Sequence, residues 1–192
     1  GIDKDYNAVE ASKFGLLLKL LEGEDVNSVN KSNPILPDLD GNIFFGNSLI
    51  NSSEIKENKT LEIINPFDFQ DLRFDVIIGN PPYLKVEDMK NITPVELPIY
   101  KENFKSAYKQ FDKYFLFIEQ GLNLLKEDGV LGYIVPSKFT KLGSGKNLRK
   151  LLAKNGNLKR IVSFGANQVF KDKTTYTCLL FTTKTSNETF TF

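Results

Sequence analysis

Apolar residues along the chain follow helical spacing in some segments and form short continuous runs in others. After Asp5, apolar positions three or four residues apart predict an amphipathic helix, and Asp5 is suited to cap its N-terminus. Residues 1–3, which precede it, are predicted to be the end of a strand. The side chains expected to face the core from this helix are Ala8, Ala11, Phe14, Leu18 and Leu21.

Short apolar runs predict further strands. Residues 74–78 are rich in β-branched side chains, which is typical of a strand buried on both faces of a parallel sheet. This run stops at Gly79 and the two prolines that follow. The other predicted strands cover residues 42–45, 130–135, 158–164 and 174–183, the last of them reached through a loop at 165–173.

Two more helices are predicted between these strands. One lies around residues 145–155, and the other is closed by residues 126–129. The latter has an apolar face made of Phe111, Tyr114, Phe115, Ile118, Leu122 and Leu125. Because strands and helices alternate, we expect an α/β fold with a mainly parallel sheet.

Three polar segments interrupt this pattern. Residues 22–40 and 51–60 are predicted to be loops. Residues 84–109 are irregular and charged, and Pro94 and Pro98 argue against a long helix, so we expect a mobile flap there.

Composition removes several kinds of chemistry. The 192 residues contain no histidine, which excludes Ser/His/Asp and Cys/His nucleophile arrangements and every metal site that needs imidazole. The single cysteine, Cys178, excludes an internal disulfide and a Cys-rich zinc site. No apolar run approaches the ~18 residues that a membrane span needs, and residues 1–20 lack the layout of a signal peptide. We therefore expect a cytoplasmic protein.

The net charge of +1 conceals two oppositely charged parts. Residues 129–192 contain 11 Lys or Arg and 2 acidic residues, a net of +9, whereas residues 1–128 have a net of −8. The basic part is consistent with a nucleic-acid partner. It is equally consistent with the ordinary solvated surface of a lysine-rich protein.

The segment Asn80-Pro81-Pro82-Tyr83, called here the NPPY corner, follows a predicted strand. In open α/β sheets the reactive site lies outside the carboxyl ends of the strands. Because a residue before proline avoids the helical region, the chain leaves the strand extended. The Asn80 side-chain oxygen and the Pro81 carbonyl can then face one amino group, with the Tyr83 ring beside them. This arrangement suits a planar substrate that carries an NH2 group.

The string FDVIIGNPPY resembles the adenine-N6 DNA methyltransferases of restriction-modification systems, particularly the type IIG and type I modification group. These belong to the amino-methyltransferases that use S-adenosylmethionine. GIDKDYNAVEASKFGLLLKL, GNSL, YFLFIEQGLNLLKEDGVLGYIVPSKF and QVFKDKTTYTCLLF resemble further segments of that family in the same order. The resemblance implies a Rossmann-like methyltransferase fold with a mainly parallel sheet and a last antiparallel strand.

The resemblance also assigns roles to residues. Asp3 is expected to bind the ribose hydroxyls of S-adenosylmethionine, and Asn47, where the family has an acid, its adenine. The expected cofactor-binding set is Asp3, Asn47, Ser48 and Asn80, and the expected catalytic set is Asn80, Pro81, Pro82 and Tyr83. Phe170 is expected to stack on the substrate base together with Tyr83. The lysines expected nearest to the phosphates of double-stranded DNA are Lys141, Lys146, Lys171 and Lys173.

The implied reaction takes an adenine out of the duplex, which costs about a few kcal/mol. Stacking of the base on aromatic rings contributes roughly 1–3 kcal/mol per base and offsets this cost. Asn80 and Pro81 accept hydrogen bonds from the amino group and orient it for direct displacement. No base, metal or thiol is required, so no metal site is expected. Cys178 is expected to be packed in the core, which argues against cytosine-C5 methylation.

The family's first motif, a Gly-rich turn after the first strand, is missing, because the second motif begins at residue 1. Residues 143–145 are predicted to be a loop and do not replace it. We therefore expect residues 1–192 to be part of a catalytic domain, without a target-recognition domain and inactive alone. The expected partners are DNA and the remainder of a longer polypeptide or a partner subunit, and a sheet edge is expected to be exposed or paired with another chain.

Three alternatives stay open. Glutamine methyltransferases that act on release factors, and some RNA guanine-N2 enzymes, also carry NPPY. Pro37-Asp38 followed by Glu54-Ile55-Lys56 matches the loose PD-(D/E)-x-K pattern of nucleases that hold Mg²⁺, although no apolar strand carries the acid and the lysine. A non-catalytic DNA-binding or assembly module is the third.

Overall fold

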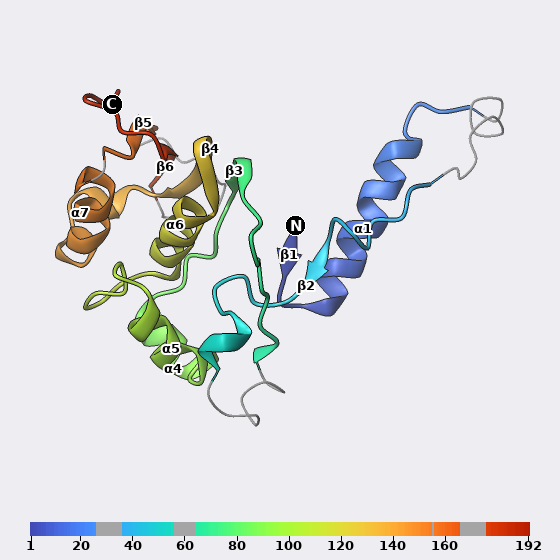
Figure 1. The fold of residues 1–192 in the computed structure, drawn as a ribbon, viewed down its shortest axis with the longest axis horizontal. Coiled ribbons are helices and arrows are strands. Elements are labelled where there is room, and N and C mark those ends of the chain that lie inside the picture. Colours follow the sequence, from blue (N-terminus) through green and yellow to red (C-terminus); the bar gives the residue numbers. More distant parts are fainter. Residues whose placement is uncertain (26–35, 56–63, 155, 166–175) are drawn as a thin grey trace. The chain divides into compact units, whose positions relative to one another are not determined.

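The computed structural model describes residues 1–25, 36–55, 64–154, 156–165 and 176–192. The chain divides into two compact units, Gly1–Phe69 and Gln70–Phe192. The first unit contains β1 (Ile2–Asp3), α1 (Tyr6–Leu21), β2 (Phe44–Phe45) and a short 3-10 turn, η1 (Ser52–Glu54) (Figure 1). No helix among the described residues is long and apolar enough to cross a bilayer.

The first unit contains a minimal parallel strand pair and one long helix. β1 and β2 pair in parallel, with Ile2 opposite Phe44 and Asp3 opposite Phe45. The predicted N-cap is confirmed, because the Asp5 side chain accepts a hydrogen bond of 2.9 Å from the backbone N–H of Asn7. Strand β1 followed by α1 is therefore the order that the sequence predicts.

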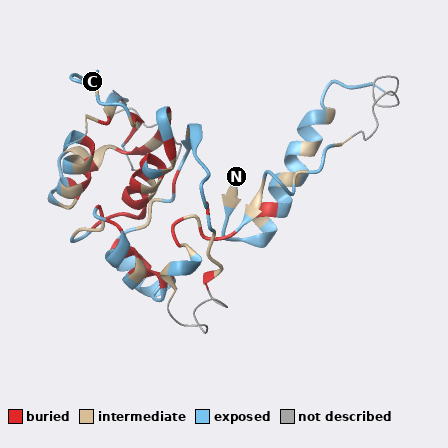
Figure 2. Ribbon diagram, in the orientation of Figure 1, coloured by how far each residue is buried: buried red, intermediate tan, exposed pale blue. Residues whose placement is uncertain are grey.

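The predicted core face of α1 is wrong. Phe14 and Leu18 expose more than half of their surface, and of the residues of α1, all of which are described, Val9 alone is buried (Figure 2). Helical spacing shows that a face is apolar, but β1 and β2 are each two residues long. Within this unit, two such strands are too short to cover a helix of 16 residues.

The second unit alternates strands and helices. It begins with β3 (Phe74–Gly79), α4 (Val86–Ile92), α5 (Glu96–Asn103) and α6 (Lys113–Leu124). It continues with β4 (Leu125–Pro136), two 3-10 turns, η2 (Ser137–Thr140) and η3 (Gly143–Gly145), then α7 (Lys146–Lys154), β5 (Leu158–Ser163) and β6 (Thr177–Thr183). The α/β class and the predicted helices near 111–125 and 145–155 are thus confirmed, but residues 126–129, expected to close the first of these helices, belong to β4.

The four strands form a mixed sheet in the order β3-β4-β6-β5. β3 and β4 are parallel, and β6 is antiparallel to both β4 and β5. Three strands therefore share one direction and the last strand opposes them, as the sequence predicts. Because β6 inserts between β4 and β5, two of the three pairings are antiparallel.

One face of this sheet packs against α6. Leu131, Tyr133 and Val135 alternate along β4 and are buried. Gly121 of α6 permits the close approach, because a Cβ at this position would lie 2.3 Å from a methyl carbon of Leu131. The side of β4 that carries Leu131, Tyr133 and Val135 therefore faces α6.

The predicted burial of β3 on both faces is wrong. Val76 and Ile78 expose 63% and 80% of their surface. β3 is an edge strand, and these two residues pair with Val130 and Gly132, which lie on the side of β4 that alternates away from α6. In the described part of the second unit, this side of the sheet is not packed as closely as the α6 side.

The flap expected at residues 84–109 is also corrected. The segment forms α4 and α5, and Met89 and Tyr100 are completely buried. Pro98 is the third residue of α5, where a backbone N–H has no partner within the helix, so the proline costs no hydrogen bond. Pro94 lies between the two helices rather than inside one.

Candidate active site

The NPPY corner follows the last residue of β3. Pro81 is buried, Asn80 and Pro82 are exposed, and Tyr83 is half-buried. The two consecutive prolines lack the backbone N–H that a further ladder pair would need, so the strand ends at Gly79. The predicted position of residues 80–83 at the carboxyl end of a strand is therefore confirmed.

The Tyr83 hydroxyl lies between two acceptors. It is 2.6 Å from the side-chain oxygen of Asn80 and 2.9 Å from the backbone oxygen of Ile134 in β4. Burial is the main cause that raises the pKa of the Tyr83 phenol, so the hydroxyl keeps its proton at neutral pH and shares this single hydrogen between the two oxygens as a three-centre hydrogen bond. The contact orients the Asn80 amide and leaves its oxygen a second lone pair for a substrate amino group.

Backbone hydrogen bonds hold the segment after the corner against the start of α6. The N–H of Lys113 donates to the Leu84 oxygen at 2.8 Å, and the N–H of Val86 donates to the Phe111 oxygen at 3.1 Å. Between them, Asp112 is buried and forms a 2.7 Å ion pair with Lys138, which follows β4. The corner is thus attached to two elements more than 25 residues away in the chain.

A second tyrosine lies behind Tyr83. The rings of Tyr83 and Tyr114 are edge to face, with centroids 6.0 Å apart and an interplanar angle of 75°. Tyr114 is completely buried, and its hydroxyl donates to the backbone oxygen of Pro136 at 3.1 Å. The sequence indicated Tyr114 only as one residue of an apolar helix face, because its partners are distant in the chain.

In the first unit, Asp3 and the turn after β2 come together at the carboxyl ends of the parallel pair. The backbone N–H of Gly46 donates to the backbone oxygen of Asp3 at 2.8 Å. The Asp3 carboxylate is exposed, and one of its oxygens accepts from the N–H of Asp5 at 2.9 Å. An exposed carboxylate at this place fits a pair of sugar hydroxyls.

The Asn47 side chain is more buried than its predicted contact with the cofactor adenine requires. Its side chain is buried, and its oxygen accepts a 3.0 Å hydrogen bond from the N–H of Leu49, which closes a local turn. Ser48, the next residue, is half-buried. Contacts of Asn47 and Ser48 with a cofactor therefore stay predictions.

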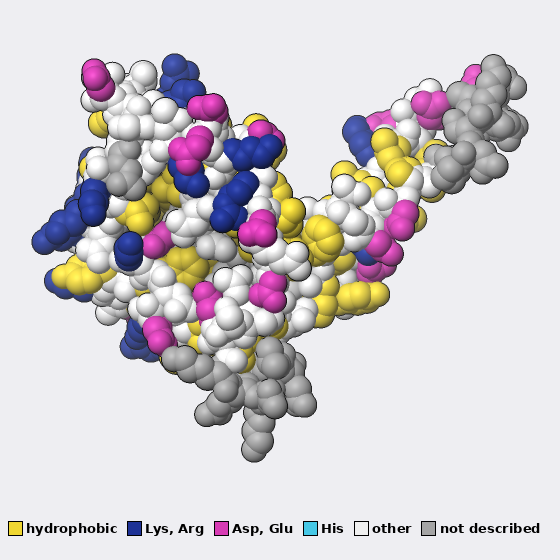
Figure 3. All heavy atoms as spheres, in the orientation of Figure 1, with side chains coloured by type: hydrophobic (Ala, Val, Ile, Leu, Met, Phe, Trp, Pro, Cys, Tyr) yellow, Lys and Arg dark blue, Asp and Glu magenta, His cyan; other side chains and the backbone are white. Residues whose placement is uncertain are grey.

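The remaining predicted residues are distributed as follows. Lys141 and Lys146 are exposed near the start of α7, and Figure 3 shows Lys and Arg side chains along the margin of the second unit that carries this helix. Phe170, Lys171 and Lys173 lie outside the described residues. The structure thus brings Asn80, Pro81, Pro82 and Tyr83 together in the second unit, and Asp3, Asn47 and Ser48 in the first.

The predicted position of Cys178 in the core is confirmed. It is completely buried in β6, and burial raises the pKa of its thiol to about 11. A thiol with this pKa is almost entirely protonated at neutral pH, and the thiol is a poor nucleophile compared with the thiolate.

The nuclease pattern gains no support from the described residues. Glu54 lies in η1 rather than on a strand, and its carboxylate accepts from the N–H of Asn51 at 2.9 Å. Lys56 lies outside the described residues. In the described ranges, no three acidic or cysteine side chains group in a way that can hold a metal ion.

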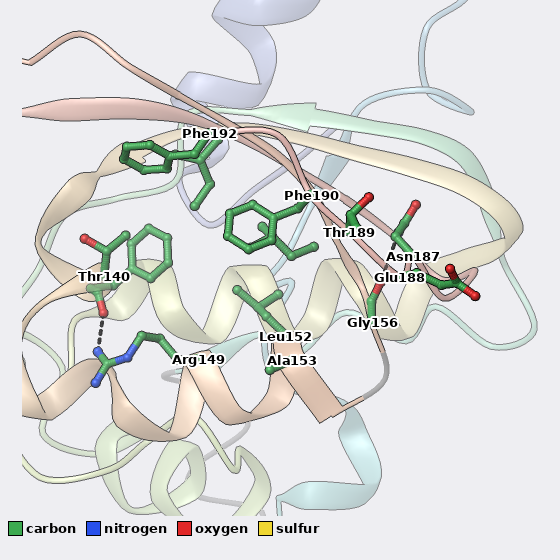
Figure 4. Close-up of a pocket in the computed structure, with 13 residues that line it drawn as sticks. Thr140, Arg149, Leu152, Ala153, Gly156, Asn187, Glu188, Thr189, Phe190 and Phe192 are labelled. Carbon is green, nitrogen blue, oxygen red and sulfur yellow. Dashed lines mark hydrogen bonds between the residues drawn. The ribbon is translucent and has the colours of Figure 1, made fainter.

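The second unit also has a cavity of about 440 Å³ between α7 and the C-terminal residues 187–192 (Figure 4). Its walls are mainly apolar, and none of the predicted site residues lines it. Arg149 is its basic residue, and its guanidinium donates to the backbone oxygens of Phe139 and Leu142 at 2.5 and 2.8 Å. The Arg149 guanidinium is therefore already bonded within the fold. Because the cavity also contains none of the predicted site residues, we take the NPPY corner as the candidate active site.

Several known proteins are similar to this chain. Residues 1–170 match the family described as Eco57I restriction-modification methylase. The type II restriction enzyme and methyltransferase RM.Eco57I of Escherichia coli is 59% identical over all 192 residues, which cover 19% of that protein. The type II methyltransferase M.BstVI of Geobacillus stearothermophilus is 33% identical over 60% of the chain and 20% of its own length. The chain thus spans about a fifth of these relatives.

Solved structures share the fold. The DrdV–DNA complex, determined by cryo-electron microscopy, covers 96% of this chain with a TM-score of 0.61 and 19% identity, and the match takes up 20% of that chain. The EcoKI M protein, from a type I restriction enzyme, covers 96% with a TM-score of 0.54 and 18% identity, over 30% of its chain. The Rossmann-like methyltransferase fold expected from the sequence is therefore confirmed.

Proposed function

The chain belongs to the Eco57I restriction-modification methylase family, and from this premise we propose that it carries the catalytic corner of a DNA adenine-N6 methyltransferase that uses S-adenosylmethionine. The observation that supports this proposal most strongly is the geometry of residues 80–83. An amide oxygen held by a tyrosine hydroxyl lies directly after a strand end, next to a half-buried aromatic ring. Such a corner suits an aromatic base with an exocyclic amino group.

The residues of the corner act by orientation. The Asn80 side-chain oxygen and the Pro81 carbonyl accept the two amino hydrogens, so that the nitrogen lone pair is directed toward the incoming methyl group. S-adenosylmethionine, when bound, supplies that methyl group on a sulfonium. The Tyr83 ring stacks on the base, which offsets part of the cost of taking it out of the duplex. With Cys178 buried and no other cysteine in the chain, a cysteine-dependent attack on cytosine C5 has no nucleophile here.

Two features of the first unit support the cofactor assignment. The Asp3 carboxylate at the end of β1 is exposed, and a carboxylate can accept hydrogen bonds from two ribose hydroxyls. The turn at residues 46–48 is joined to β1 by the hydrogen bond from the Gly46 N–H to the Asp3 backbone oxygen. We propose that Asp3, Asn47 and Ser48 form the nucleoside side of the cofactor site.

The substrate class is tested with the full-length gene product that contains this chain. S-adenosylmethionine labelled in its methyl group is supplied with duplex DNA, with transfer RNA, or with a release factor whose glutamine is unmodified. We expect label in DNA alone. Label in RNA or in the protein, with none in DNA, would favour the alternative NPPY enzymes and refute the proposal.

Replacement of Asp3 by asparagine is expected to weaken S-adenosylmethionine binding at least tenfold. Hydrogen bonds to a charged acceptor contribute about 1.5–3 kcal/mol, and the amide removes the charge while keeping the shape. Isothermal titration calorimetry of the full-length gene product measures the change. Asp38→Asn, at another exposed acid of the same unit, is the matched control and should bind as the parent does. Equal affinities of the Asp3 variant and the parent would remove Asp3 from the cofactor site.

The double substitution Lys141→Glu and Lys146→Glu is expected to reduce the salt dependence of DNA binding. The slope of log K against log salt is negative, and each lost phosphate contact reduces its magnitude by about 0.9, so two reduce it by about 2. Fluorescence anisotropy, measured at salt concentrations between about 50 and 200 mM, gives this slope. Lys90→Glu, at an exposed lysine of α4, is the control. An unchanged slope in the double variant would exclude these two lysines from the interface.

A further inference from the structure

Two tyrosine hydroxyls complete the edge of β4 where β3 has ended. Gly79, the last residue of β3, is paired with Tyr133, and β4 continues for three more residues to Pro136. The N–H of Ser137 donates to Tyr176 on the β6 side at 2.9 Å. Because successive residues of a strand direct their polar groups to opposite sides, the oxygens of Ile134 and Pro136 point to the side that β3 has left.

These two oxygens are the acceptors of the two hydroxyls. Tyr83 donates to Ile134 at 2.9 Å, and Tyr114 donates to Pro136 at 3.1 Å. An unpaired buried carbonyl costs free energy comparable to a lost hydrogen bond, so both contacts have a structural reason to persist. The tyrosines thus take the place of the ladder bonds that the prolines of the NPPY corner cannot make.

The two rings also touch each other, and they differ in how firmly they are held. Tyr114 is completely buried and packs edge to face against Phe115, with centroids 4.7 Å apart. Tyr83 is half-buried and packs edge to face against Tyr114. The orientation of the Tyr83 ring is therefore fixed from the core side by Tyr114.

We infer that Tyr114 is a positioning residue for methyl transfer, which acts on Asn80 through Tyr83. Its buried ring and its hydroxyl bond to Pro136 fix the Tyr83 ring, and the Tyr83 hydroxyl in turn orients the Asn80 amide at 2.6 Å. The inference rests on the proposed function, since it assigns Tyr114 a part in the same site. Tyr114 itself touches neither the base nor the cofactor in this scheme.

A positioning role predicts a particular kinetic result. Tyr114→Phe keeps the ring and removes the hydroxyl, so we expect kcat to fall about five- to tenfold, the effect of one misplaced hydrogen bond. The dissociation constant of S-adenosylmethionine should not change. Tyr83→Phe should lower kcat by a similar factor. The double variant should lose much less than the product of the two factors, because both substitutions break the same chain of contacts.

The test uses the full-length gene product in single-turnover methyl transfer at saturating DNA, with melting temperature and cofactor affinity measured in parallel. Tyr133→Phe is the matched control, a buried tyrosine of β4 three residues from Pro136 whose ring lies against Gly79. The inference would be overturned if kcat fell no further in Tyr114→Phe than in Tyr133→Phe. It would also be overturned if the loss of kcat in the double variant equalled the product of the losses in Tyr83→Phe and Tyr114→Phe.

Two further arms keep the result decisive. If Tyr114→Phe does not fold, Tyr83→Phe is compared in the parent and in an Asn80→Ala background, where the inference predicts that its effect on kcat disappears. An effect of the same size in both backgrounds overturns the inference. A parent protein that transfers no methyl group to DNA refutes the proposed function, whereas an active parent with unaffected tyrosine variants refutes the inference alone.

Discussion

Replacement of Asn80 by alanine is expected to lower the rate of methyl transfer by about a thousandfold while folding is retained. Removal of one preorganised polar group that acts in the transition state costs about 10²–10³ in kcat in other enzymes. The upper end is expected here because the Asn80 oxygen is one of only two acceptors proposed to orient the amino group. Tyr83 retains its bond to Ile134 in the variant, so the corner keeps its shape.

Single-turnover transfer from labelled S-adenosylmethionine measures this loss, and calorimetry measures cofactor affinity. Asn123→Ala, at an exposed asparagine of α6, is the matched control and should react at the parent rate. A loss of less than about tenfold in Asn80→Ala would mean that the amide does not orient the amino group, and the assigned mechanism would fail.

Replacement of Lys113 by methionine is expected to reduce the stability of the chain by about 3–5 kcal/mol, because it leaves a buried carboxylate without its cation. The Lys113 ammonium lies 3.3 Å from a carboxylate oxygen of Glu96, and the two side chains are 7% and 8% exposed. The same oxygen accepts the Tyr100 hydroxyl at 2.6 Å. This ion pair connects α5 to Lys113, the first residue of α6. The backbone N–H of the same lysine donates to the oxygen of Leu84, which follows the NPPY corner.

Urea denaturation followed by circular dichroism measures this effect. Lys113→Met combined with Glu96→Gln should lose less than Lys113→Met alone, because no charge is then left buried. Lys126→Met, which breaks an exposed ion pair with Asp75, is the control and should cost 1 kcal/mol or less, about the value of surface pairs. Equal losses in Lys113→Met and Lys126→Met would show that the buried pair is not important for the fold.

Local patterns in the sequence were sufficient for the elements that depend on nearby residues. The cap at Asp5 forms within the first turn of α1, and the apolar face of α6 repeats at helical spacing. The NPPY corner was predictable as a strand end for the same reason, since two prolines terminate a ladder whatever lies beside them. The lone cysteine was also placed correctly, because three apolar residues follow it in β6.

Burial and partner choice depended on distant residues, and the sequence misjudged them. Apolar spacing in α1 and β-branched residues in β3 show which side chains are apolar, but not which elements cover them. The absence of a long helix at Pro94 and Pro98 is confirmed, but the expected flap folds into α4 and α5, because the first turn of a helix tolerates proline. The insertion of β6 between β4 and β5 is a long-range pairing that no local pattern specifies.

The same limit explains the incomplete view of the candidate site. The acceptor of the Tyr83 hydroxyl is 51 residues away in the chain, so its anchor on β4 was not predictable. The contact of Asn47 with a cofactor stays a prediction, and the sequence did not indicate that the side-chain oxygen of this residue also closes a local turn, since a buried amide oxygen needs a donor. Asp112 and Lys138, which fasten the corner, are 26 residues apart and carry no motif.

The nucleosides of DNA treated with the full-length gene product and S-adenosylmethionine test the central claim most directly. After enzymatic digestion, mass spectrometry separates N6-methyladenine from N4-methylcytosine and C5-methylcytosine. The account predicts N6-methyladenine as the only new nucleoside, absent when the Asn80→Ala variant is used. A methylated cytosine, or no new nucleoside from an enzyme that binds S-adenosylmethionine, would contradict it.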